Sequence, residues 1–250
     1  MVMSKLASRQ DAYGHAYWDH YRGRGGYVGV ERDDGYTGVS YGAEVYFREY
    51  KDWLPFEKRA MRFVRGRVLD VGCGAGRAAL HLQSKGHDIL AVDHSPLAIK
   101  ICKLRGVKSA RVMSITDLST KLGAFDTILM LGNNFSLMGT HKEAHRLLKR
   151  WHGITSASGR IIAQTGDPYQ TTDPTHLAYH RRNRKLGRAG GEMRLRIWYL
   201  KYGTPWLPFL HVSRKELRAI LQGTGWELAR TLESGDWKYF AILEKTERTK

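Results

Sequence analysis

A short apolar strand that runs into a glycine-rich turn constrains this chain more than any other feature. Residues Arg67–Val71 form a short apolar run around one acid, Asp70, and three glycines follow at alternate positions: Gly72, Gly74 and Gly76. Glycines let a backbone come close to a ligand, and the first N–H groups of a following helix are free to bind it. The pattern predicts a buried strand, a ligand-binding turn and a helix that begins at Arg77.

Strands and helices alternate along the rest of the chain. A second strand, Asp88–Asp93, precedes Ser95 and Pro96, which are typical of a helix start. Further strands are expected at Ala110–Met113, Asp126–Leu131, Arg160–Gln164, Trp226–Thr231 and Trp237–Leu243, and capped helices after Thr140 and Ser213. This alternation predicts an α/β fold with a parallel sheet covered by helices on both faces.

Two segments do not fit this alternation. Residues 1–55 are rich in Tyr and Trp, with one stretch, Glu44–Trp53, that could be helical. Residues 166–212 are too long for an ordinary connection between two elements. We therefore expect one domain over residues 1–250, with an N-terminal aromatic lid (1–55), a ligand-binding core (56–165), an inserted lid (166–212) and a closing helix and strands (213–250).

Composition excludes several classes of protein. Only Cys73 and Cys102 occur, so neither a disulfide scaffold nor a four-cysteine zinc site is expected. His141 and His145 have the spacing of a metal-binding pair, but no third ligand is evident, and no metal is expected. The first six residues lack the apolar run of a signal peptide, and no apolar stretch is long enough to span a membrane. A cytoplasmic protein is the expectation.

The net charge of +17 favours an anionic partner. It is concentrated in residues 180–201, where eight cations stand against a single acid, Glu192. Aromatic residues are interleaved with these cations, as in proteins that bind RNA. Met193–Leu200, however, alternates apolar and cationic residues like an exposed strand, which favours a lid with a solvated or substrate-binding face.

Two acids refine the identity of the ligand. A dinucleotide-binding turn would carry glycine at position 77, where this chain has arginine. Asp70 would repel a pyrophosphate, but it suits a ligand with an ammonium or sulfonium group. Asp93 ends the second strand, where an acid can accept hydrogen bonds from ribose hydroxyls.

The segment from Val68 to Arg77, together with Asp93, resembles the first two motifs of class I S-adenosylmethionine-dependent methyltransferases. The resemblance implies a Rossmann-like, doubly wound seven-stranded sheet whose last strand is antiparallel. It also implies that Asp117 and Leu118 hold the adenine and that the end of the fourth strand faces the methyl group. The implied cofactor-binding residues are Tyr50, Asp70, Gly72, Gly74, Gly76, Arg77, Asp93, His94, Asp117, Leu118, Leu131 and Gly132.

The acceptor is less constrained than the cofactor. Leu131–Phe135 and Glu49–Leu54 look like the glycine N-methyltransferase branch and its small-molecule relatives, which implies that Tyr50 lies near the cofactor. The same likeness places Asn133 or Asn134 near the acceptor. His176, His180 and His211 lie in or beside the insertion, and any one of them is a candidate base. Motifs for methylation of exocyclic amines and of RNA ribose are absent, since Asn133-Asn134-Phe135-Ser136 follows the fourth strand.

We therefore expect an enzyme that methylates an O or N atom of a small molecule, which can be acidic. One alternative is an RNA or protein methyltransferase that uses the basic residues 180–201. The other is a non-catalytic protein that binds the cofactor.

Overall fold

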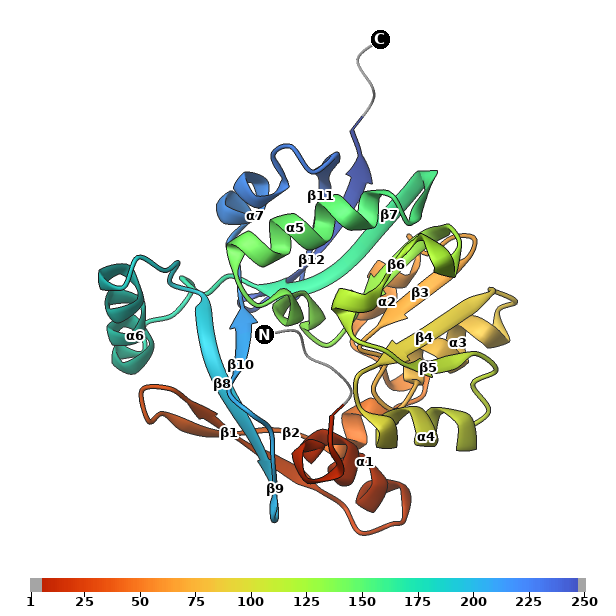
Figure 1. Ribbon diagram of the computed structural model, residues 1–250, viewed down its shortest axis with the longest axis horizontal. Coiled ribbons are helices and arrows are strands. Elements are labelled where there is room, and N and C mark those ends of the chain that lie inside the picture. Colours follow the sequence, from red (N-terminus) through yellow and green to blue (C-terminus); the bar gives the residue numbers. More distant parts are fainter. Residues whose placement is uncertain (1–5, 247–250) are drawn as a thin grey trace.

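A seven-stranded mixed sheet, called the large sheet below, forms the centre of the protein (Figure 1). The computed structural model describes residues 6–246; residues 1–5, which contribute to the signal-peptide expectation, and 247–250 lie outside this range. The strand order is β11-β12-β7-β6-β3-β4-β5. The strands are β3 (Val68–Val71), β4 (Ile89–Asp93), β5 (Ala110–Val112), β6 (Phe125–Met130), β7 (Thr155–Gly166), β11 (Trp226–Glu233) and β12 (Lys238–Lys245).

The direction of the strands agrees with the expected topology. Strands β7, β6, β3, β4 and β5 pair in parallel, whereas β12 is antiparallel to both of its neighbours, β7 and β11. The prediction of a seven-stranded sheet with its last strand antiparallel is therefore confirmed. In such a sheet the carboxyl ends of the parallel strands meet along one edge, where ligands bind.

Helices cover both faces of the large sheet. One hydrophobic core lies against α5 (His141–His152) and α7 (Arg214–Leu221) and contains Trp151 and Leu217. A second core contains Phe56, Ala79 and Cys102 on the opposite face, beneath α2 (Pro55–Met61), α3 (Arg77–Ser84) and α4 (Pro96–Leu104). The two cysteines are free and buried in the structure, as expected for small core residues.

The starts of these helices follow the sequence closely. The side chain of Ser95 accepts from the N–H of Ala98, and that of Ser213 forms a reciprocal capping box with Glu216. Thr140 accepts from the N–H of Glu143, but the Glu143 side chain pairs with Arg146. The second half of the expected capping box at α5 is therefore replaced by an ion pair on the helix surface.

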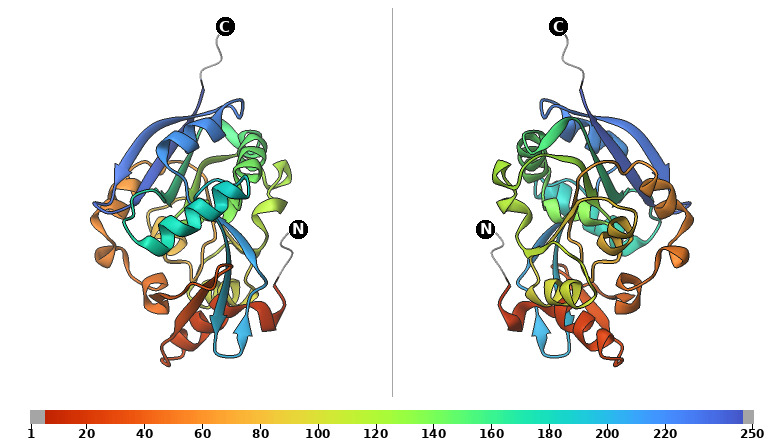
Figure 2. Two further views of the ribbon diagram at one scale, coloured as in Figure 1. Left: turned by 90° about the vertical axis from the view of Figure 1, so that its left-hand side faces the viewer. Right: turned by 90° about the vertical axis from the view of Figure 1, so that its right-hand side faces the viewer.

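The two predicted lids meet in a second, antiparallel sheet, called the small sheet below. The N-terminal hairpin supplies β1 (Tyr27–Arg32) and β2 (Thr37–Gly42), and the insertion supplies β8 (Glu192–Tyr199), β9 (Tyr202–Gly203) and β10 (Leu207–Leu210). Strands run in the order β10-β8-β1-β2, with β9 paired to β8. Figures 1 and 2 show β1, β2, β9 and α1 (Ala12–Tyr21) at the bottom of the molecule, and β11 and β12, two strands at one end of the large sheet, at the top.

The insertion also contains α6 (Pro174–Lys185), which the sequence analysis did not anticipate. The helix predicted over Glu44–Trp53 was wrong, because two short 3₁₀ turns, η2 (Ala43–Tyr46) and η3 (Tyr50–Asp52), occupy that segment. Tertiary contacts explain the break, since the ring of Tyr46 packs on Tyr17 while the carbonyl of Phe47 accepts from Arg105. The other 3₁₀ turns are η1 (Ser8–Gln10), η4 (Ile115–Asp117), η5 (Thr120–Leu122) and η6 (Asn134–Met138).

Candidate active site

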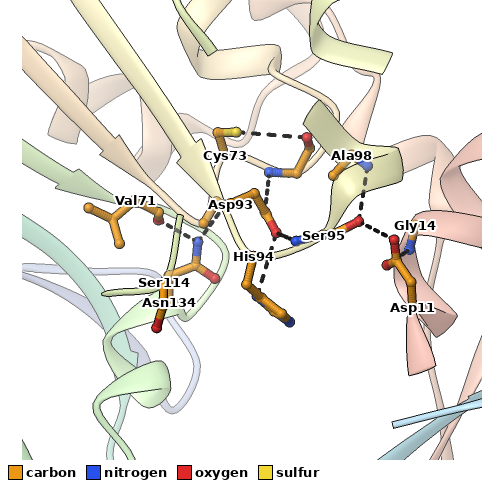
Figure 3. Close-up of polar contacts among 12 residues, drawn as sticks. Asp11, Gly14, Val71, Cys73, Asp93, His94, Ser95, Ala98, Ser114 and Asn134 are labelled. Carbon is orange, nitrogen blue, oxygen red and sulfur yellow. Dashed lines mark hydrogen bonds and ion pairs between the residues drawn. The ribbon is translucent and has the colours of Figure 1, made fainter. Parts of the chain in front are cut away.

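The glycine turn and Asp93 meet at the carboxyl edge of the large sheet. The N–H of Gly74 donates to Asp93 Oδ2 at 3.0 Å, and the N–H of Ser95 donates to Oδ1 at 2.9 Å (Figure 3). Gly74 has a φ of 54°, and a Cβ atom there would lie 3.2 Å from the ring of Tyr46, so the turn requires glycine. The carboxylate of Asp93 thus fixes the turn and keeps acceptor capacity for a further ligand.

Asp70 lies below this turn as a buried carboxylate. Its Oδ2 atom has no hydrogen-bond partner among the described residues. Burial raises the pKa of Asp70 to about 7; Arg77 opposes the rise and Asp93 adds to it. A buried carboxylate without a partner is stabilised by a positive charge nearby, so Asp70 fits a ligand that carries an ammonium or sulfonium group.

A cavity opens beside these acids, at the ends of β3, β4 and β5. It is lined by Val71, Gly72, Val92, Asp93, His94, Met113, Ser114, Ile115 and Leu137. The apolar side chains among them suit a flat ring, and Asp93 and His94 supply the polar side. The predicted binding residues include three of these nine, Gly72, Asp93 and His94. Met113 and Leu137 were among those missed, and their only signal was their position after β5 and β6.

The cavity is narrow in this structure. Its volume is about 30 Å³, close to the share of one water molecule in the liquid. Leu137 on η6 forms one wall, and the amide of Asn134 donates to the carbonyl oxygens of Val71 at 2.9 Å and Gly72 at 2.8 Å. Contacts of Asn134 and Leu137 thus hold η6 against the glycine turn.

The end of β6 carries two residues in the left-handed region of backbone space. Gly132 has a φ of 65° and Asn133 a φ of 63°, a conformation that asparagine tolerates better than most residues. The N–H of Gly132 donates to Gln164 Oε1 at 2.8 Å, which ties β6 to β7. Asn133 Oδ1 is buried without a partner among the described residues, so it can bind a ligand at this edge.

Three tyrosines from the N-terminal lid lie near the glycine turn. The rings of Tyr17 and Tyr46 are 4.7 Å apart between centroids, and Tyr13 lies 6.1 Å from Tyr46. Burial raises the pKa of all three hydroxyls, so they stay protonated and act as hydrogen-bond donors. A lid of aromatic residues was expected here, but the sequence did not single out these three tyrosines.

Other predicted site residues make their contacts elsewhere. Tyr50 stacks on His81 of α3 with centroids 3.8 Å apart, and Arg77 pairs with Glu57 of α2. His176 lies on α6, where its Nδ1 is 3.0 Å from Arg32 Nη1. Asp117 is exposed beside the cavity, whereas Leu118 is fully buried in the core, and Leu131 is buried at the end of β6.

Some negative findings apply to the part of the chain that the structure describes. Residues 6–246 contain no cluster of three His, Cys, Asp or Glu side chains arranged to hold a metal, and His145 Nδ1 is 3.0 Å from the carbonyl oxygen of Ile220. No helix within that range is long and apolar enough to cross a membrane. A larger hollow of about 420 Å³ lies at the α7–β11 turn, and none of the predicted site residues line it.

Comparison with known proteins points to one family. A family model described as a methyltransferase domain matches residues 68–159. The chain is 37% identical over 81 residues to the ubiquinone biosynthesis O-methyltransferase of Xanthomonas oryzae, covering 30% of this chain and 34% of the relative. It is 39% identical over 71 residues to the magnesium-protoporphyrin O-methyltransferase of Rhodobacter capsulatus, covering 26% and 31%. The matches thus span about a third of the length of these curated relatives.

A solved structure resembles the chain over almost its full length. The SAM-dependent methyltransferase from Bacteroides fragilis, in complex with S-adenosyl-L-homocysteine, aligns with a TM-score of 0.82 and 27% identity. The alignment covers 97% of this chain and 98% of that one, so it includes both lids.

Proposed function

We propose that this chain, a class I S-adenosylmethionine-dependent methyltransferase by fold and family match, transfers a methyl group to an O or N atom of a small molecule. The expected family and the expected cofactor, S-adenosyl-L-methionine, are confirmed by the matches, which also support an enzyme. The acceptor belongs to the proposal.

The observation that carries this proposal is the meeting of three features at one edge of the large sheet. The glycine turn offers a backbone that a ligand can approach, Asp93 offers acceptors for hydroxyl groups, and Asp70 offers a buried carboxylate whose Oδ2 has no hydrogen-bond partner among the described residues. A nucleoside that carries a cationic side chain matches this combination.

The cofactor, when bound, supplies a methyl group already activated by its positive sulfur. The task left to the protein is therefore alignment, which can supply about 7–11 kcal/mol toward a reaction between two bound partners. Asp93 and the glycine turn would fix the nucleoside end, and Asp70 would hold the cationic end. The small sheet and the tyrosines from the N-terminal lid would exclude water and align the acceptor at the end of β6.

Several observations favour a small acceptor over RNA. The cations of residues 180–201 are spread over α6, β8 and the loops after each of them, so they do not form one continuous stripe along a single element. On β8, Arg196 pairs with Glu31 and lies between Trp198 and Trp206, at 4.6 and 4.7 Å from the two rings. The names of the two curated relatives also refer to small-molecule O-methylation. We further propose a cytoplasmic location, because the chain's two cysteines are free thiols.

A labelling experiment tests the proposal. Purified protein with cofactor labelled in its methyl group is incubated with a metabolite extract, and the label is followed into separate fractions. We expect the label in the small-molecule fraction. Label in RNA or protein would support the alternative acceptors, and cofactor binding without any transfer would support a non-catalytic protein.

A further inference from the structure

A histidine with one buried ring nitrogen that lacks a hydrogen-bond partner among residues 6–246 lies on the side of the site where the acceptor is expected. His211 follows β10, and its backbone N–H donates to the carbonyl of Gly191 at 2.9 Å. Its Nε2 atom is buried and has no hydrogen-bond partner among the described residues. A buried ring nitrogen without a partner is costly, which suggests that a ligand completes it.

The surroundings of His211 place it beside the ends of β6 and β7. Its ring lies 4.9 Å from that of Trp237, and Trp237 covers Gly166, the last residue of β7. The chain just past β6 is tied to β7 close by, because the N–H of Gly132, next to Asn133, donates to Gln164 Oε1 at 2.8 Å. Asn133 Oδ1 is the second buried acceptor without a partner in this neighbourhood.

The small sheet gives this region an apolar wall. Phe209 contacts His211, with ring centroids 5.8 Å apart. The register of β10 with β8 places Met193, Leu195 and Leu207 on the same face as Phe209, and all four are half-buried. An aromatic acceptor would pack on this face and direct a polar group toward His211.

We propose that His211 takes the proton of a hydroxyl group on an aromatic acceptor as that oxygen receives the methyl group. This inference rests on the proposed function and narrows its acceptor to an aromatic alcohol of the phenol type. Asn133 Oδ1 would orient the acceptor as a positioning residue.

The step balances in atoms and charge. A lone pair of the acceptor oxygen forms the new O–C bond, and the bond between sulfur and the methyl carbon breaks with its electron pair left on sulfur. The O–H proton moves to His211 Nε2, so the positive charge passes from sulfur to the imidazole. The oxygen becomes strongly acidic once it bonds to carbon, so a weak base is sufficient.

The protonation state of His211 suits this role. Burial lowers its pKa to about 4, and no charged side chain contributes to the shift. The ring is therefore neutral at physiological pH and can accept a proton. The imidazolium formed by the transfer is unstable in this buried place, so it readily releases its proton again.

The test compares two acceptors that differ in their need for a base. Phenol keeps its proton at about pH 9, whereas 4-nitrophenol is ionised there and needs none. Wild type, H211Q and H87Q are assayed with labelled cofactor and each acceptor. His87 is the matched control, because it contacts the carbonyl of Gly66 at the opposite edge of the large sheet.

We expect H211Q to lose about 10²–10⁴-fold in kcat toward phenol and to lose little toward 4-nitrophenol. H87Q should match wild type with both. Equal losses of H211Q on the two acceptors would show a structural role and overturn the proposal. Methylation of aniline but not of phenol would overturn it as well, yet leave the proposed function intact.

A binding measurement covers the case in which H211Q does not fold. The histidine NMR signals of wild type saturated with S-adenosylhomocysteine are followed while catechol is added. The signal of His211 is identified by its absence from the spectrum of H211Q or H211N. We expect this signal to shift when catechol is added. If none shifts, the proposal is wrong even where the protein methylates other acceptors, whereas failure to bind S-adenosylhomocysteine would refute the proposed function itself.

Discussion

Replacing Asp70 by asparagine should make the cofactor-free protein more stable, and by an amount that grows with pH. Asp70 is buried, its Oδ2 lacks a partner among residues 6–246, and burial raises its pKa from 3.8 to about 7. Above pH 3.8 the unfolded chain releases this proton while the folded chain keeps it. The folded state therefore binds more protons, and its stability falls as pH rises toward 7.

The magnitude follows from the two pKa values. The raised pKa of Asp70 lowers the free energy of unfolding by about 2 kcal/mol at pH 5. At pH 8, where the carboxyl is ionised in both the folded and the unfolded state, it lowers this free energy by about 4 kcal/mol. Asparagine has no titration, so its own burial cost is the same at both pH values. The free energy of unfolding of D70N relative to wild type should thus rise by about 2–3 kcal/mol between pH 5 and pH 8.

Urea unfolding at the two pH values measures this difference, and D88N is the control. Asp88 is exposed at the opposite edge of the sheet and pairs with Arg67. If the difference in free energy of unfolding between D70N and wild type stays constant from pH 5 to pH 8, the reasoning is refuted. With cofactor bound, wild type should become more stable than D70N, because the positive charge of the cofactor compensates Asp70. Saturating S-adenosylmethionine should raise the free energy of unfolding of wild type more at pH 8 than at pH 5. For D70N the rise should be equal at both pH values.

Two further predictions concern the cofactor and the basic residues. D93A should weaken S-adenosylmethionine binding by about 1.5–3 kcal/mol, the scale of hydrogen bonds to a charged group; calorimetry should show it, and a folded D93A with unchanged affinity would contradict the assignment. RNA binding should show little salt dependence, although Arg181, Arg182, Arg184, Lys185 and Arg188 are mostly exposed. If the five residues neutralised five phosphates of a single strand, the logarithm of the binding constant would fall with the logarithm of the salt concentration with a slope of about −3.5. Such a slope would favour RNA as the partner if it were lost when the five residues are replaced by alanine.

The cofactor side of the site could be predicted because its signals are local. Strand β3, the glycine turn and the start of α3 occupy consecutive residues, and each has a distinct pattern. Asp93 and Ser95 then mark the same edge of the sheet one strand later. The topology of a parallel sheet brings these pieces together without any further information.

The lids could not be predicted in the same way. Strand β1 pairs with β8, so Gly29 lies opposite Trp198 from a distant part of the sequence. Nothing local in either segment specifies that partner. Helix α6 was missed because it is largely polar and buries only Tyr179, His180 and Asn183, which gives a weak apolar pattern.

The pairing of the two lids has a consequence for the acceptor. Strand β1 is central in the small sheet, between β2 and β8, and α1 packs against the same strands through Ala12 and Ala16. The wall that carries Phe209 and leads to His211 is therefore held in place by the N-terminal hairpin. The hairpin's neighbours Tyr17 and Tyr46 also lie beside the glycine turn, so direct contacts connect the turn with the small sheet. We therefore expect the cofactor to order the acceptor site before the acceptor arrives.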